Sequence, residues 1–228
     1  MSKVYIGVGH GGTDSGTIGH GLKESEVNLD IALACRDYLK SAGITTVISR
    51  TTDVYKSVQE KSSQCNSENP ACCVEIHNNA GNGRAVGFEV YYQSKNNNSK
   101  NLATAIEECV KEIGQTSRGV KTNLLSSGAD YYHMLREVKC PSVLVECAFL
   151  DSEDYLKVNT HAKRQIMGIA LAKGVLKFLG KSIPKDTNQK KIMYIVQAGA
   201  FSTKEAAEVY AKQLTKYGIK SIIKQMEV

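Results

Sequence analysis

The feature that most constrains the fold is an apolar, strand-like run at residues 4–8, which ends in a glycine-rich turn around His10. Glycines in such a turn let other groups approach the backbone closely, so the histidine ring is open to a ligand. Residues 72–77 and 142–146 follow the same plan. Each of these apolar runs ends in one residue, His77 or Glu146, that can bind a metal or transfer a proton.

The segments between these runs predict alternating helices and strands. Residues 26–39 carry apolar side chains at helical spacing, and residues 44–49 concentrate β-branched residues as strands do. Together with the first run they form a strand–helix–strand unit, which favours parallel pairing. We therefore predict an α/β fold in which a mostly parallel, twisted sheet carries helices on both faces. The further helices are expected at residues 54–67, 102–113 and within 154–179, and a further strand at 88–92.

The strand ends predict a single site. In open α/β sheets ligands bind beyond the carboxyl ends of the strands, so His10, His77 and Glu146 should converge. Glu24 follows a second glycine turn and would complete two imidazoles and a carboxylate, the ligand set of many catalytic zinc sites. None of these spacings is a short local zinc motif. From the residues alone, a zinc site and ordinary packing are equal alternatives.

A series of short motifs makes the prediction more specific. They are Gly9–Gly12, Gly21–Glu24, Arg50 with Asp53, Ile76–His77 with Asn79, Arg118–Lys121, and Val145–Glu146 with Phe149–Leu150. In this order, over roughly residues 1–180, the chain resembles the zinc-dependent N-acetylmuramoyl-L-alanine amidases, including those of phage endolysins and of mother-cell lysis.

The resemblance implies an activity and a set of roles. It implies a peptidoglycan hydrolase that cleaves the amide bond between N-acetylmuramic acid and L-alanine and so lyses the cell wall. It implies Zn²⁺ bound by His10, Glu24 and His77, and Glu146 as the catalytic acid–base group. The alternatives are a cell-wall-binding adaptor without catalysis and a zinc hydrolase of another peptide or amide bond.

Two further residues are candidates for substrate binding. Asn79 belongs to one of the motifs, and His133 precedes the last motif strand, where it would line the substrate groove. For His133 the alternative is a partly buried histidine whose hydrogen bonds are satisfied. For Arg50 and Asp53, three residues apart, the expected role is a structural ion pair.

The C-terminal part predicts a separate module. Residues 1–180 would form the catalytic domain, residues 181–191 a linker, and residues 192–228 a compact β-α-β unit with its helix at 204–217. Residues 194–202 resemble the opening of SPOR domains, which bind the glycan strands of peptidoglycan. Such domains usually contain two β-α-β halves, and a single half leaves a sheet edge unpaired. We therefore expect either a homodimer through residues 192–228 or docking on the chain's own catalytic domain.

The charge distribution indicates which classes of partner the chain can bind. Of the net charge of +6, residues 181–228 carry +5 from nine lysines and four acidic residues, which suits an anionic partner such as a cell-wall polymer. Nucleic-acid binding is not expected, because this basic tail lacks arginine and any reading motif.

The remaining expectations concern membranes and cysteines. No apolar stretch is long enough to span a bilayer or to act as a signal peptide. We expect the protein to be made in the cytoplasm and to reach the wall after lysis or by a holin-type route. The seven cysteines show no paired metal-ligand spacing and are expected to be reduced and mostly buried.

Overall fold

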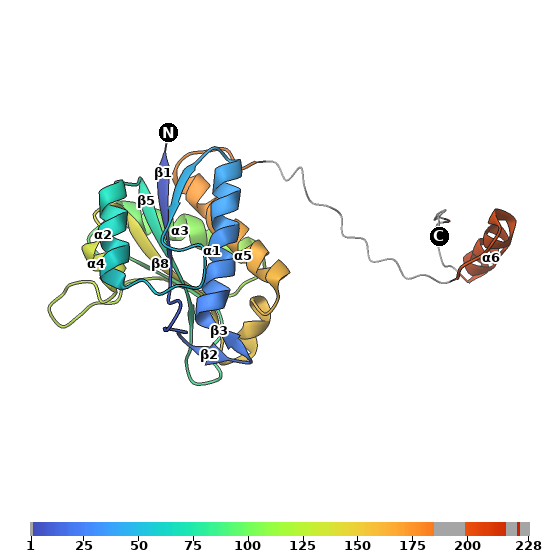
Figure 1. Cartoon of the computed structure of the whole chain (residues 1–228), viewed down its shortest axis with the longest axis horizontal. Coiled ribbons are helices and arrows are strands. Elements are labelled where there is room, and N and C mark those ends of the chain that lie inside the picture. Colours follow the sequence, from blue (N-terminus) through green and yellow to red (C-terminus); the bar gives the residue numbers. More distant parts are fainter. Residues whose placement is uncertain (1, 185–198, 218–222, 224–228) are drawn as a thin grey trace. The chain divides into compact units, whose positions relative to one another are not determined.

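The computed structural model describes residues 2–184, 199–217 and 223. The chain divides into two units, Met1–Lys185 and Asp186–Val228 (Figure 1). The first unit holds all the strands that the structure describes. It is therefore the unit that positions the candidate site.

A six-stranded sheet lies at the centre of the first unit. Its order is β4-β1-β5-β8-β6-β7, with the bounds β4 (Thr45–Ile48), β1 (Lys3–Val8), β5 (Cys72–Asn79), β8 (Ser142–Phe149), β6 (Phe88–Tyr92) and β7 (Ser117–Lys121). Strands β4, β1, β5 and β8 run parallel to one another, whereas β6 runs antiparallel to β8 and parallel to β7. The predicted α/β fold with a mostly parallel sheet is confirmed.

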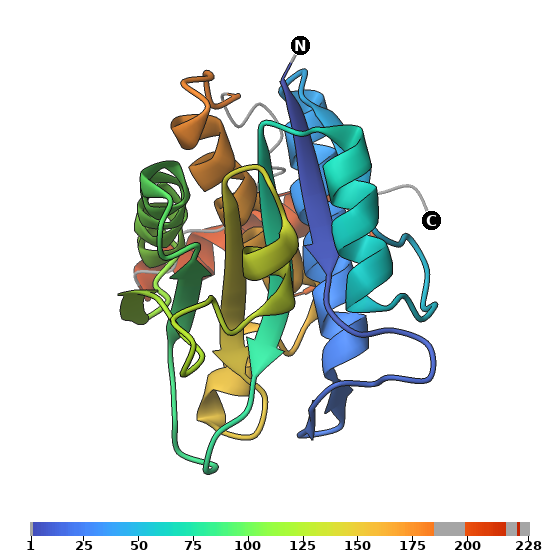
Figure 2. The ribbon, with the colours of Figure 1, turned by 90° about the vertical axis from the view of Figure 1, so that its left-hand side faces the viewer.

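Helices cover both faces of this sheet (Figure 2). Helices α1 (Glu24–Ser41), α3 (Asn97–Glu112) and α5 (His161–Phe178) pack on one face, with α5 in contact with both α1 and α3. On the other face, α2 (Val58–Glu68) packs against the short α4 (His133–Glu137). Figure 2 shows α2 and α4 in front of the sheet and α1 and α5 behind it.

The two faces follow from the alternation of side chains along the strands. Val4, Ile6 and Val8 of β1 join the large apolar cluster under α1, α3 and α5. Tyr5 points the other way, into a small cluster that includes Cys65 and Cys73. All seven cysteines are free thiols, and all but Cys140 are buried, as expected.

Some short elements were not predicted from the sequence. Strands β2 (Ile18–Gly19) and β3 (Leu22–Lys23) form a small hairpin before α1, and a 3-10 helix, η1 (Glu153–Lys157), follows β8. These elements are too short to show a hydrophobic period. In the second unit, α6 (Lys204–Lys216) confirms the predicted helix. The strands expected on either side of it, and with them the predicted dimer contact, lie outside the described residues.

None of the helices in the described part of the chain is both long and apolar enough to cross a bilayer.

Candidate active site

Three of the predicted residues meet in space. The ligand-type atoms of His10, Glu24 and His77 all lie within 4.8 Å of one another. His10 follows β1, His77 lies in the adjacent parallel strand β5, and Glu24 is the first residue of α1. The cluster therefore forms at the carboxyl edge of the sheet, where parallel strands present their ligands.

The backbone at His10 is unusual. Its φ of 57° lies in the left-handed region, which is uncommon for a residue with a side chain and is often found at functional sites. The turn is held from outside, because Arg50 Nη2 and Asn28 Nδ2 donate to the Gly9 carbonyl at 3.1 and 3.2 Å. The imidazole is oriented as well, with Nδ1 2.8 Å from Asp14 Oδ2 and Nε2 3.2 Å from Glu24 Oε2.

The buried carboxylate of Glu24 lies between the two histidine rings. Its Oε1 is 2.9 Å from His77 Nδ1 and accepts from the Asn78 backbone N–H at 3.1 Å, while Oε2 accepts from the Thr17 N–H at 3.0 Å. Burial raises the pKa of Glu24, but the hydrogen bonds to His10 and His77 outweigh it and leave the pKa well below its usual value. The group is therefore an anion fixed in place.

The two imidazoles complete the cluster. The rings of His10 and His77 meet edge to face with their centroids 5.0 Å apart. Although burial lowers the pKa of His77, its partners Glu24 and Glu75 raise it to about 10. Metal binding requires neutral imidazole, so a divalent cation would displace this proton. The arrangement can hold a cation, and it makes that binding dependent on pH.

Glu146 lies within β8, opposite His77 in the register of β5 and β8 and so beside the cluster. Its side chain is nearly buried, and Oε2 has no hydrogen-bond partner among the described residues. Burial, reinforced by Glu24 and Glu89, raises the pKa of Glu146 to about 7. A carboxyl group with such a pKa can both accept and release a proton near neutral pH.

A cavity of about 160 Å³ opens onto His77 and Glu146. Its other lining residues come from α2, α4 and the sheet: Val58, Glu75, Tyr132, His133, Met134 and Leu144. The space lies directly against the group that can transfer a proton. The cavity therefore adjoins both a residue of the cluster and the candidate proton-transfer group.

The two predicted substrate-binding residues differ in their surroundings. His133 lines the cavity, and its Nε2 lies 3.1 Å from Ser62 Oγ, so it is a partnered histidine that still faces the site. Asn79 donates to Glu89 Oε2 at 3.2 Å. Glu89 also accepts from Arg118 and Lys121. Substrate contact by Asn79 or His133 stays a prediction.

Several residues that build the site were not recognised in the sequence. Asp14 and Asn28 are polar residues without a distinctive motif, and their roles appear only when the chain is folded. Arg50 and Asp53 form no direct salt bridge among the described residues: burial lowers the pKa of Arg50, whereas Asp53 raises it through its charge and accepts from the Gly12 N–H at 2.9 Å. Both residues brace the His10 turn from the loop after β4.

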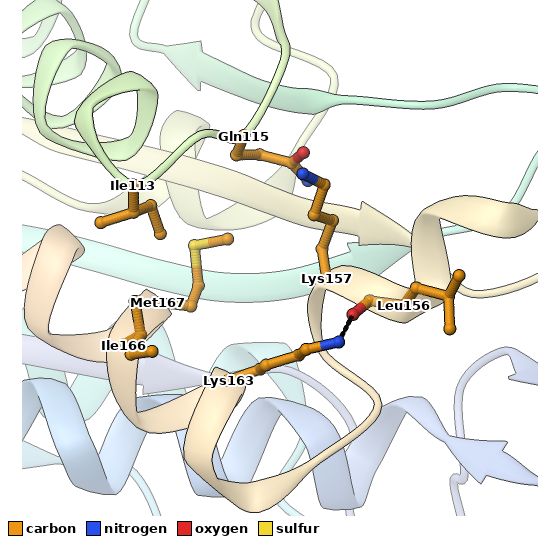
Figure 3. A pocket seen from close by; sticks show the side chains of 7 residues that line it. All are labelled: Ile113, Gln115, Leu156, Lys157, Lys163, Ile166 and Met167. Atoms are coloured by element: carbon orange, nitrogen blue, oxygen red, sulfur yellow. Dashed lines mark hydrogen bonds between the residues drawn. The ribbon is translucent and has the colours of Figure 1, made fainter. Parts of the chain in front are cut away.

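A larger cavity of about 350 Å³ lies elsewhere, between the end of α3, η1 and the start of α5 (Figure 3). It is lined by Ile113, Gln115, Leu156, Lys157, Lys163, Ile166 and Met167. Lys163 Nζ donates to the Leu156 carbonyl at 2.6 Å across its rim. None of these residues is a histidine, cysteine or carboxylate, so this cavity lacks the groups that catalysis at a metal needs.

Comparisons with known proteins agree with this site. A family model described as N-acetylmuramoyl-L-alanine amidase matches residues 4–177, and a SPOR domain model matches residues 173–227. The sporulation-specific N-acetylmuramoyl-L-alanine amidase of Bacillus subtilis is 30% identical over 98% of this chain and 84% of its own length. The endolysin of Bacillus phage SPP1 is 32% identical over 81% of this chain and 71% of its length.

A solved structure shares the fold. Cwp6 from Clostridium difficile superposes with a TM-score of 0.76 and 36% identity, over 78% of this chain and 29% of Cwp6. The amidase match covers β1 to almost the end of α5, which is the whole sheet with the His10, Glu24 and His77 cluster. This chain therefore belongs to the N-acetylmuramoyl-L-alanine amidase family of peptidoglycan hydrolases.

Proposed function

We propose that the amidase uses zinc, held by His10, Glu24 and His77, with Glu146 as its acid–base group. The observation that carries the proposal is the convergence of these three ligand side chains within 4.8 Å, beside Glu146. The bond cleaved is the amide between the lactyl group of N-acetylmuramic acid and the L-alanine of the stem peptide.

The residues present fit zinc. Two imidazoles and one carboxylate suit this ion, whereas magnesium and calcium prefer oxygen ligands. The surrounding loop is also shaped to the donors, because a Cβ at Gly16 would lie 2.6 Å from both Glu24 Oε2 and the His10 ring. When bound, zinc would supply a Lewis acid that polarises the scissile carbonyl and lowers the pKa of water.

The chain's own groups then handle the proton. Glu146 would accept a proton from the attacking water and deliver it to the departing L-alanine nitrogen. Its raised pKa suits both steps, since a group near the working pH gives up a proton as readily as it takes one. The low exposure of Glu146, 8%, limits competing water at the carboxylate.

The second unit is proposed to hold the enzyme on its substrate. The SPOR match over residues 173–227 supports binding to peptidoglycan, and the basic charge of this region suits anionic wall polymers. The finer proposal is that two such units pair into a homodimer. Sedimentation equilibrium of the full chain would show a dimer, and a strictly monomeric protein at micromolar concentration would exclude it.

The test of the activity is metal removal on purified peptidoglycan. Chelator-treated protein should lose turbidity-clearing activity, and added Zn²⁺ should restore it. Mass spectrometry should then find free muramic lactyl ends and released peptides that begin with L-alanine. Products cut within the stem peptide would favour another amide substrate, and binding to the wall without any product would favour the adaptor.

A matched pair of histidine variants makes this test specific. His77→Gln should abolish zinc binding and hydrolysis together. His161→Gln changes a histidine whose side chain is 73% exposed and should leave both unchanged. Full activity in His77→Gln would contradict the assignment of the ligand.

A further inference from the structure

An unusually buried ion pair lies next to the metal cluster. Lys61 of α2 and Glu75 of β5 contact each other with side chains only 3% and 1% exposed. In every other described pair between a lysine or arginine and a carboxylate, at least one partner is far more exposed. Removing two charges from water is costly and often brings no net stability. A contribution to stability therefore does not explain why the Lys61–Glu75 pair is buried at this place.

Gly7 makes room for the pair. It is the neighbour of Glu75 in the register of β1 and β5, and a Cβ built on it would lie 1.5 Å from Glu75 Oε2. Gly7 lies within the regular strand β1 and is not among the residues with positive φ. Its lack of a side chain is therefore explained by the space that the carboxylate occupies. Gly7 and Glu75 form one packing unit.

The same unit extends to the metal ligand. Glu75 and His77 are two residues apart on β5 and so point to the same face of the sheet. Gly9 lies against His77 as Gly7 lies against Glu75, because a Cβ on Gly9 would be 2.4 Å from the His77 ring. Two glycines thus make space for the carboxylate and the imidazole, side by side.

The His77 ring has a carboxylate at each nitrogen. Nδ1 is 2.9 Å from Glu24 Oε1, and Nε2 is 3.6 Å from Glu75 Oε1. The latter distance is longer than a hydrogen bond, so Glu75 acts on the ring through its charge. The oxygen is held in place because the same Oε1 accepts from Lys61, which also donates to the Val8 carbonyl at 3.4 Å.

We infer that Glu75 is a positioning residue that orients His77 for metal binding, with Lys61 holding its carboxylate and Gly7 providing the space. Partners on the far nitrogen of a ligating histidine fix the ring and strengthen the ligand. In this structure Nδ1 of His77 faces Glu24, and Nε2 faces Glu75. The inference rests on the proposed metal function of His77.

The test measures the Zn²⁺ affinity of the metal-free full chain by competition with a colorimetric chelator. Glu75→Gln alone would leave the charge of Lys61 buried without its partner and so destabilise the fold. The decisive variant is therefore Lys61→Gln with Glu75→Gln. The two substitutions together remove both charges and keep the side-chain volumes nearly constant. We expect Zn²⁺ to bind about 10- to 100-fold more weakly. Circular dichroism and thermal unfolding would verify that the variant is folded.

A relocation variant separates positioning from packing. Gly7→Asp with Glu75→Ser moves the carboxylate from β5 to the same register position of β1, the strand whose Val8 carbonyl already accepts from Lys61. We expect this variant to recover most of the lost Zn²⁺ affinity. The control is Asp30→Asn, which breaks the 2.9 Å pair with Arg164 on the other face and should leave Zn²⁺ affinity unchanged.

The outcomes distinguish this inference from the proposed function. A wild-type chain that binds no Zn²⁺ would contradict the proposed metal function itself. If the wild type binds Zn²⁺ and the folded Lys61→Gln with Glu75→Gln variant binds it equally well, only the role of Glu75 is wrong. Failure of a folded relocation variant to recover affinity would also contradict that role.

Discussion

The two faces of the sheet are built differently. The face under α1, α3 and α5 is a continuous apolar cluster in which most side chains are fully buried. The face under α2 and α4 holds only a small cluster and shares its space with the Lys61–Glu75 pair and the cavity beside Glu146. The first face stabilises the fold, and this leaves the second free to hold charges and a cavity.

The alternation of β1 shows how one strand serves both faces. Val4, Ile6 and Val8 fill the apolar core, whereas Gly7 and Gly9 on the opposite side leave room for Glu75 and His77. A strand buried on both faces usually reads as continuously apolar. Here the glycines replace apolar side chains only on the side of the active site.

The largest expected effect is on the second face, at Glu146. Glu146→Gln keeps the shape of the side chain but removes proton transfer, so hydrolysis of peptidoglycan should fall about 10²- to 10⁴-fold. Zn²⁺ binding and folding should persist, because Glu146 is not part of the ligand cluster. The control is Glu153→Gln, at an exposed position of η1, which should remain fully active. Normal hydrolysis by Glu146→Gln would refute the assignment.

A core substitution on the first face should lower stability and leave hydrolysis unchanged, the reverse of Glu146→Gln. Leu171→Ala removes a fully buried side chain of α5 and should lower the free energy of unfolding by about 2–5 kcal/mol. Urea titration measures this loss, and hydrolysis per folded molecule should not change. Ile166→Ala on the same helix, 50% exposed, should change stability by no more than about 0.5 kcal/mol. A folded Leu171→Ala enzyme without activity would show that the faces are not separable.

The smallest expected effect is the pH dependence of hydrolysis, which tests Glu146 on the second face without any substitution. Burial first, then Glu24 and Glu89, raise the pKa of Glu146, against the opposing charges of His77 and His10. A general base works only without its proton, so activity should fall by a factor of about ten per pH unit below the pKa of Glu146, which is about 7 without a metal. A bound cation would move this limb to lower pH. The pH profile of kcat/KM measures it, and a profile without an acid limb over the whole pH range in which the enzyme stays folded and keeps its metal would contradict the role of Glu146.

Much of the fold could be predicted from the sequence because the long elements carry clear periods. The apolar stripe of α1 and the β-branched run of β4 identify a strand–helix–strand unit, and the structure confirms its parallel pairing. Strand β6 was also predicted, but its antiparallel direction was not. Direction depends on the path of the chain between elements, which residue periods do not encode.

The candidate site divides in the same way. His10, Glu24 and His77 were identified as a set from their positions at strand ends and turns and from the family resemblance, and the structure brings them together. Arg50 and Asp53 were expected to pair directly, but their side chains hydrogen-bond to backbone groups of the His10 turn, because sequence proximity does not decide which groups a side chain meets. The compartment in which the protein acts stays a prediction.

The sequence by itself determined which residues could bind a metal and which elements would present them, because residue type and hydrophobic period are local properties. Only the tertiary structure decided that Gly7, Lys61 and Glu75 form one buried unit beside His77. Residues 7, 61 and 75 are far apart along the chain, and their contact depends on strand register and on the helix packed above it. Register and packing are set by the whole fold, so no single segment of the sequence contains them.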